Sequence, residues 1–185
     1  MSMSLTFVTG NAHKAEKAAA LLGRELQHVK LDLDELQTTD LNELVEHKVR
    51  QAYEKVGSPV IVDDFGFGFK ALNGLPGPFT KFFIGSPDGP EMMCRMVDSF
   101  GDRSALVSSA IGYYDGVTLK VFVRSLEGST AEHPRGSNGI DTDKIFIPAG
   151  YSQTRAELSD EEYDKVYTMV RPYDELRNFL DAVDG

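Results

Sequence analysis

The feature that most constrains the fold is an apolar run that passes through a tight turn into an alanine-rich segment. Leu5 to Thr9 is apolar, Gly10-Asn11 follows, and AHKAEKAAALL then stops at Gly23. A short apolar run predicts a buried strand. An alanine-rich run between a capping Asn and a terminal Gly predicts a helix. The order strand, turn, helix is typical of α/β folds.

Further strands are predicted along the chain. Leu26 to Leu31 is a candidate second strand, and the β-branched run from Pro59 to Val62 predicts another, followed by the glycine-rich loop FGFGFKALNGLPGPF. Ala105 to Tyr114 and Val117 to Ser125 flank Asp115-Gly116, a turn that favours an antiparallel hairpin. A parallel start and a later hairpin together predict an α/β fold with a mixed sheet.

Helical patterns fill much of the remaining chain. Asp40-x-x-Glu43 and Ser159-x-x-Glu162 resemble capping boxes, and Pro172 must interrupt the helix that follows the second one. Phe79 to Phe100 is also helical in pattern, with a break at Gly85 to Pro87. The helix after Asp40 has an apolar face formed by Leu41, Leu44, Val45, Val49, Ala52 and Val56.

Length and cysteine content narrow the class of protein. A chain of 185 residues can bury an adequate core without disulfides or structural metal, and the lone Cys94 cannot form a bridge within it. We expect one domain over residues 1–185, with Cys94 as a small buried hydrophobe. MSMSLTFVTGN lacks the features of a signal peptide and no apolar run has membrane-spanning length, so we expect a cytoplasmic protein without a membrane partner.

The charge balance restricts the partners. Asp and Glu number 29 against 19 Lys and Arg, and the formal charge of -10 repels nucleic acid and anionic lipid. We therefore expect no nucleic-acid partner. A small polyanion could still bind where local lysines and a divalent cation outweigh the global field.

The turn at the start of the first predicted helix is a candidate phosphate site. Backbone N–H groups and the helix dipole favour an anion there, Gly10 allows close approach, and Lys14 adds positive charge. The turn lacks the GxxxxGK[ST] spacing of a P-loop. The alternative is that Asn11 simply caps the helix and Lys14 is solvated.

The acidic pair Asp63-Asp64 is a candidate metal site. It follows an apolar run, at the sheet edge where ligands of α/β folds usually bind, and Glu35 could add a ligand from the loop after the second predicted strand. Carboxylate oxygens suit Mg²⁺. Side chains alternate along a strand, so Asp63 and Asp64 can share a site only if the strand has ended there. The alternative is an ordinary acidic strand terminus.

The loop LNGLPGPFTK is a candidate positioning device. Its two prolines and two glycines predict a fixed backbone path that places Lys81 at the start of a helix. No functional role is assigned to the histidines or to the phenylalanines near the loop, which we expect in the core. The histidines are His13, His28, His47 and His133, and the phenylalanines are Phe65, Phe67, Phe69, Phe82 and Phe83.

The combination of motifs resembles the inosine triphosphate pyrophosphatase (Ham1-like) family, which hydrolyses non-canonical purine nucleoside triphosphates. The matching segments are VTGNAHKAEKAAALL at 8–22, VDDFGFGFKALNGLPGPFTKFF at 62–83, HPRG at 133–136 and PAGYSQTRAEL at 148–158. The resemblance implies an elongated α/β fold with a central mixed sheet flanked by helices, a cleft between two lobes, and a homodimer. It also implies Mg²⁺-dependent cleavage of ITP, dITP or XTP to the monophosphate and pyrophosphate.

The resemblance also implies roles for individual residues. Thr9, Gly10, Asn11, Lys14 and Lys81 are expected to bind the triphosphate, and Asp143 lies in the base-recognition loop. Glu35 and Asp64 are expected to bind metal, with Asp63 as a second-line ligand. Asp64 would also orient or deprotonate the attacking water, while Lys14 and Lys81 stabilise charge during catalysis.

Several positions depart from the family pattern. Phe65 stands where a Thr or Ser is usual, and Thr142-Asp143-Lys144 replaces an aromatic-Asp-Pro sequence. The Lys-Asn and Ser-His-Arg elements align with Tyr163-Asp164 and Tyr167-Thr168-Met169, so neither is preserved.

These departures leave three hypotheses open. The first is the pyrophosphohydrolase described above, the second a nucleotide-binding or sensing protein without turnover, and the third a pyrophosphohydrolase with a different nucleobase preference. The contacts made in the family by the Lys-Asn and Ser-His-Arg elements have four candidate replacements here, namely Tyr163, Tyr167, Lys165 and Arg171. The more ordinary interpretation of these four residues is surface tyrosines and solvated charges.

Overall fold

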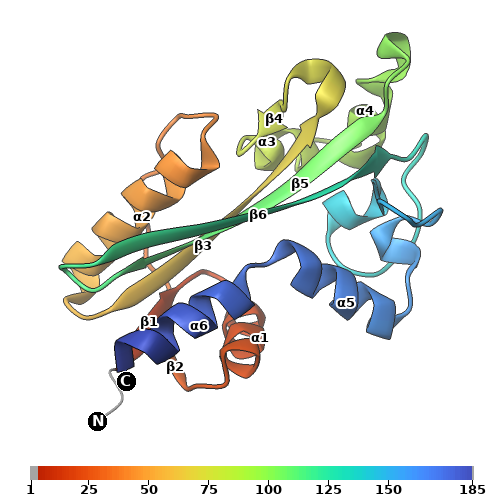
Figure 1. Ribbon diagram of the computed structural model, residues 1–185. Helices are drawn as coiled ribbons and strands as arrows, with labels where there is room; N and C mark the ends of the chain where they lie inside the picture. The colour runs from red at the N-terminus through yellow and green to blue at the C-terminus, as the bar shows by residue number, and fades with distance from the viewer. Residues whose placement is uncertain (1–3, 185) are drawn as a thin grey trace. The chain divides into compact units, whose positions relative to one another are not determined.

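The computed structural model describes residues 4–184 and contains a mixed sheet flanked by helices (Figure 1). The strands are β1 (Leu5–Val8), β2 (Leu26–Val29), β3 (Val60–Phe69), β4 (Pro76–Gly77), β5 (Ser104–Tyr114), β6 (Leu119–Thr130) and β7 (Phe146–Pro148). Their order is β2-β1-β3-β5-β6-β7, with β4 paired to β3. β1 is parallel to β2 and β3, whereas β4 is antiparallel to β3 and β7 is antiparallel to β6, so the predicted mixed sheet is confirmed.

The helices follow the predicted pattern. They are α1 (Ala12–Leu22), α2 (Leu41–Val56), α3 (Thr80–Ile84), α4 (Gly89–Arg95), α5 (Asp160–Val170) and α6 (Tyr173–Asp184). Short 3₁₀ turns occupy Lys70–Leu72, Asp98–Phe100, Asp141–Lys144 and Arg155–Glu157. No helix within residues 4–184 is both long and apolar enough to cross a bilayer.

The chain divides into two compact units. The described residues of the first unit are 4–64, 109–123 and 171–184, and those of the second are 65–108 and 124–170. The predictions of a single domain and of a cleft between two lobes stay predictions.

In the first unit, helices cover both faces of the sheet. Leu44, Val45 and Val49 of α2 pack with Val8 and Ala110 in one buried cluster. On the other face α6 packs near α1, and Phe179 lies edge-to-face against Tyr113 of β5, with ring centroids 5.1 Å apart. Ala110 and Tyr113 differ by an odd number of positions along β5, so their side chains point to opposite faces.

The ends of α1 and α2 form as their sequences predict. Asn11 Oδ1 accepts a hydrogen bond from the backbone N–H of Lys14, and Asp40 Oδ1 accepts from those of Asn42 and Glu43. Gly23 ends α1 and Gly57 ends α2, both in the left-handed region with φ of 66° and 73°.

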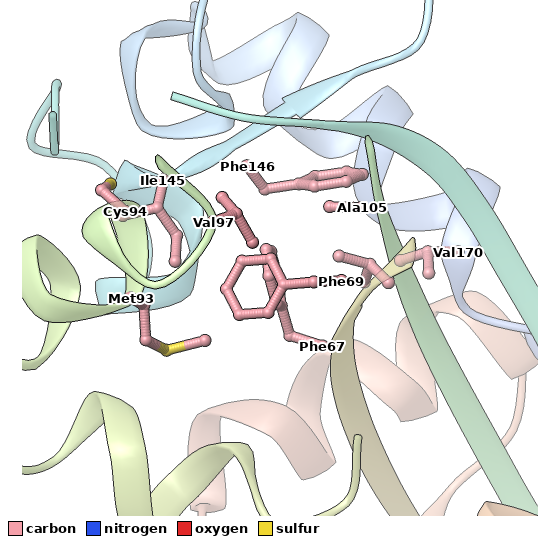
Figure 2. Packing of buried hydrophobic residues seen from close by; sticks show 10 residues of the cluster. Phe67, Phe69, Met93, Cys94, Val97, Ala105, Ile145, Phe146 and Val170 are labelled. Atoms are coloured by element: carbon pink, nitrogen blue, oxygen red, sulfur yellow. The ribbon is translucent and has the colours of Figure 1, made fainter. Parts of the chain in front are cut away.

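In the second unit, aromatic side chains of β3 lie within the hydrophobic core (Figure 2). Phe67 lies edge-to-face against Phe69 and against Phe146, at centroid distances of 5.2 and 6.0 Å. Cys94 of α4 is buried in this cluster, as predicted. Burial raises the pKa of its thiol to about 11.

The predicted glycine-rich loop after Asp64 is wrong over FGFGF, because β3 continues to Phe69. Phe67 and Phe69 face the core, and Gly66 and Gly68, which alternate with them, have no side chain to place on the other face. A Cβ on Gly68 would lie 2.3 Å from the carbonyl oxygen of Gly74, and one on Gly66 would lie 3.0 Å from the backbone of Gly77. The glycines therefore serve the approach of the following segment rather than a turn.

The prediction that all five phenylalanines near this loop lie in the core is wrong for one of them. Phe82 is 66% exposed, whereas Phe83, its neighbour on α3, packs against the core. Phe82 lies on the side of this five-residue helix that faces solvent, whereas Phe83 and the buried Thr80 face inward.

Candidate functional site

The turn between β1 and α1 borders a cavity of about 230 Å³ within the first unit. Five predicted site residues line it, together with a lysine that the sequence analysis missed. They are Thr9, Gly10, Lys14, Glu35 and Asp63, with Lys48 as the additional residue. Asn11 caps α1 beside this cavity, and Thr9 Oγ1 accepts a hydrogen bond from its backbone N–H. The structure thus brings the predicted phosphate turn and two predicted acidic residues to one cavity.

Lys14, Arg171 and Asp63 form a cationic cluster at the site. Lys14 Nζ lies 3.0 Å from Asp63 Oδ2, and Arg171 Nη1 donates a hydrogen bond of 2.7 Å to the same oxygen. Both oxygens of Asp63 are engaged, since Lys14 also lies 3.1 Å from Oδ1. The interpretation of Arg171 as a solvated charge is therefore wrong, because its side chain is 9% exposed and bound to a buried carboxylate.

Lys48, Glu35 and Asp64 form an anionic cluster. Lys48 Nζ lies 2.7 Å from Asp64 Oδ2 and 3.2 Å from Glu35 Oε1. Burial alone would lower the pKa of Lys48, but attraction to Asp64 and Glu35 outweighs burial, so the pKa is raised. Two carboxylates therefore share a single ammonium group.

The acidic pair divides between these clusters because β3 does not end at it. Asp63 and Asp64 are consecutive strand residues, so their side chains point to opposite faces. The partner strand β1 pairs with β3 only as far as Phe7 and Ile61. Beyond that register the carboxylates lie past the carboxyl end of β1, where its turn begins.

The predicted residue Asp143 has a buried environment in the second unit. Arg155 Nη1 lies 2.9 Å from Asp143 Oδ1, and the Tyr163 hydroxyl donates a 2.9 Å hydrogen bond to Oδ2. The Arg155 guanidinium also stacks 4.2 Å from the centre of the Tyr163 ring. Burial and the Asp143 charge raise the pKa of Tyr163. The description of Tyr163 as a surface tyrosine is wrong, because it holds this buried carboxylate.

The predicted residue Lys81 lies on α3 of the second unit, as the second residue of that helix. Its ammonium lies 5.0 Å from the centre of the Phe82 ring. Thr80, the preceding residue, is buried and accepts a hydrogen bond from the backbone N–H of Phe67. That hydroxyl ties the start of α3 to β3. The substrate roles of Lys81 and Asp143 stay predictions.

The sequence motifs did not predict the contacts of Lys48, Arg155 and Arg171. Of these three residues, only Lys48 has a sequence pattern that could have indicated its role. Lys48 falls seven residues after Leu41, on the apolar face of α2, and a charge within such a face is unusual. Arg155 and Arg171 carried no such signal. Arg155 lies in a 3₁₀ turn and Arg171 between two helices, where periodicity has no meaning.

The comparisons with known proteins identify the family. A sequence profile described as the Ham1 family matches residues 5–179. The chain belongs to the Ham1 family. An inosine triphosphate pyrophosphatase of Schizosaccharomyces pombe is 38% identical over 97% of this chain and 96% of that protein. A dITP/XTP pyrophosphatase of Methanopyrus kandleri is 38% identical over 89% of each chain.

Solved Ham1 structures share the fold. A HAM1 protein from Coxiella burnetii has a TM-score of 0.86, with 23% identity over 97% of this chain and 99% of that one. The Staphylococcus aureus Ham1 protein has a TM-score of 0.85, with 23% identity over 97% of this chain and 98% of that one. The predicted fold class and the predicted family are both confirmed.

Proposed function

We propose that this Ham1 family member is a nucleoside triphosphate pyrophosphohydrolase that converts non-canonical purine nucleotides such as ITP, dITP or XTP to the monophosphate and pyrophosphate. One observation carries the proposal. A cavity of the first unit is lined by Lys14 at a helix N-terminus and by Glu35 and Lys48. The Lys48 ammonium contacts both Glu35 and the neighbouring carboxylate of Asp64. Such a site suits a polyphosphate with a divalent cation. The names of the curated relatives support the same reaction and substrate class.

The carboxylates fit the proposed Mg²⁺. Glu35 and Asp64 approach the same ammonium group, so both face a point that already holds positive charge. Among the side chains described, those of residues 4–183, no three His, Cys, Asp or Glu gather into a metal-binding group. A pair of carboxylates still suits Mg²⁺, which usually keeps waters and takes its remaining ligands from substrate phosphates. Asp63 is the weaker candidate ligand, because both of its oxygens face cations.

The proposed chemistry assigns a task to each residue. Thr9, Gly10 and Lys14 would hold the phosphates at the start of α1, with backbone N–H groups and the Lys14 ammonium opposing their charge. Asp64 would orient the attacking water and accept its proton. When bound, the divalent cation would neutralise charge on the phosphate oxygens and polarise the water. We also propose, from the family resemblance, a homodimer, and from the composition a cytoplasmic location.

A substrate panel tests the function. Purified protein with Mg²⁺ is incubated with ITP, dITP, XTP and the canonical triphosphates, and pyrophosphate and monophosphate are measured. We expect ITP, dITP and XTP to be hydrolysed faster than the canonical triphosphates. If the protein binds these nucleotides but releases pyrophosphate from none of them, the hypothesis of a sensing protein would be favoured instead. A different ranking would keep the pyrophosphohydrolase and replace its nucleobase preference.

A further inference from the structure

We propose that Arg171 is a positioning residue for phosphate binding, because its guanidinium balances the charge of Asp63 and thereby leaves Lys14 with positive charge to offer an anion. The inference rests on the proposed function, which it deepens. It concerns Arg171 at the junction between α5 and α6, which lies outside the segments that match the family motifs.

The first step is the burial of Asp63. Its side chain is 2% exposed, so its negative charge has almost no water to stabilise it. A carboxylate in such a place must be paired to remain charged. Lys14 and Arg171 both supply positive charge at its Oδ2, at 3.0 and 2.7 Å.

The second step is that the two cations differ in what else they face. The Lys14 side chain is 27% exposed, lines the cavity and lies in the first turn of α1. The Arg171 side chain is 9% exposed and is not among the residues that line that cavity. Arg171 therefore supports Asp63 from the protein side, while Lys14 is the member of the cluster that a ligand can reach.

The third step is the charge of the cluster. Lys14 and Asp63 alone would form a neutral pair, and most of the attraction of Lys14 for an anion would be cancelled at close range. Arg171 makes the three-residue cluster net positive. The neighbouring cluster of Lys48, Glu35 and Asp64 is net negative by the same count. Arg171 thus gives the cluster that contains Lys14 the sign that a phosphate requires.

The test uses inorganic pyrophosphate as the probe, with binding measured by isothermal titration calorimetry on the whole protein. Arg171→Met should weaken pyrophosphate binding about tenfold, because the remaining pair is neutral. The KM for ITP should rise by a similar factor while kcat changes less. Arg171→Lys, which keeps the charge, should bind nearly as tightly as the natural protein.

The double variant Asp63→Asn with Arg171→Met separates charge from structure. It removes one anion and one cation, so Lys14 is left with a net positive charge and pyrophosphate affinity should return to within about threefold of the natural value. A purely structural role for Arg171 predicts that the double variant binds no better than the single one. The double variant also avoids leaving a buried carboxylate short of partners, which guards against misfolding of the single variant.

Arg24→Gln is the matched control. Arg24 belongs to the same unit and forms an ion pair of 2.8 Å with Asp181, and neither residue is among those that line the cavity. Its loss should leave pyrophosphate affinity unchanged. Affinity within twofold of the natural value in folded Arg171→Met, or no recovery in the double variant, would overturn the inference. A natural protein that releases no pyrophosphate from any triphosphate would instead overturn the proposed function.

Discussion

The ammonium of Lys48 lies 2.7 Å from Oδ2 of Asp64, so the carboxylate proposed to activate water is held by a lysine from the apolar face of α2. The same ammonium lies 3.2 Å from Glu35. This contact fixes the direction of the Asp64 side chain before any substrate arrives. It also means that removal of Asp64 alters a defined network rather than an isolated charge.

Asp64→Asn should lower the rate of pyrophosphate release from ITP by at least about a hundredfold, because the amide can neither accept a proton from water nor bind a divalent cation well. The amide keeps the shape of the side chain, so thermal unfolding should show an intact fold. Asp181→Asn, which changes an exposed carboxylate of the same unit, serves as the control. Retained activity in Asp64→Asn would refute the assignment.

Lys81→Ala should weaken binding of ITP more than binding of inosine, because the proposed partner of this lysine is the triphosphate. Equilibrium dialysis with both ligands measures the two losses. Lys70→Ala, at an exposed lysine of the same unit, is the control and should change neither. Equal losses for nucleotide and nucleoside would show that Lys81 has a structural role.

Arg155→Met should destabilise the protein by about 3–5 kcal/mol, since it leaves the Asp143 carboxylate buried without its cation. The two side chains are only 8% and 5% exposed, so water cannot take the place of the lost partner. Urea unfolding measures the change. The double variant Arg155→Met with Asp143→Asn should be less damaging than the single one, and a larger loss in the double variant would contradict the ion-pair explanation.

Cys94 should react slowly with iodoacetamide in the folded protein at pH 8, because burial raises the pKa of its thiol from 9.0 to about 11. The rate should rise with pH as thiolate forms, and stability should fall between these two values since the unfolded chain loses its proton first. Mass spectrometry counts the label, with one site per chain reacting in urea. Rapid labelling of the folded protein at pH 8 would contradict the burial.

Much of the fold was predictable because local patterns and tertiary packing agree. Asn11, Gly23, Asp40 and Gly57 mark helix ends by the hydrogen bonds and backbone angles that these residue types favour. The β3 segment was harder, because glycine is a poor strand former in isolation. Its strand conformation depends on the close approach of the Gly74 and Gly77 backbone, which comes near only after the chain has folded back.

The site was predictable as a set of motifs and not as a set of contacts. Thr9, Lys14 and Glu35 reach one cavity, as the motifs suggested. Arg171, however, meets Asp63 across 108 residues of chain, and no local pattern encodes such a pairing. The division of the acidic pair between two cations likewise required knowledge that β3 continues past it.

Gly68 has a consequence for anyone who diversifies this protein. Its missing side chain is the space that the carbonyl of Gly74 occupies, at a distance of 2.3 Å from where a methyl would stand. A saturation library at this codon should therefore return glycine almost alone among soluble clones. Substitutions in the loop between β3 and β4 are therefore better begun at residues that face the solvent, such as Lys70.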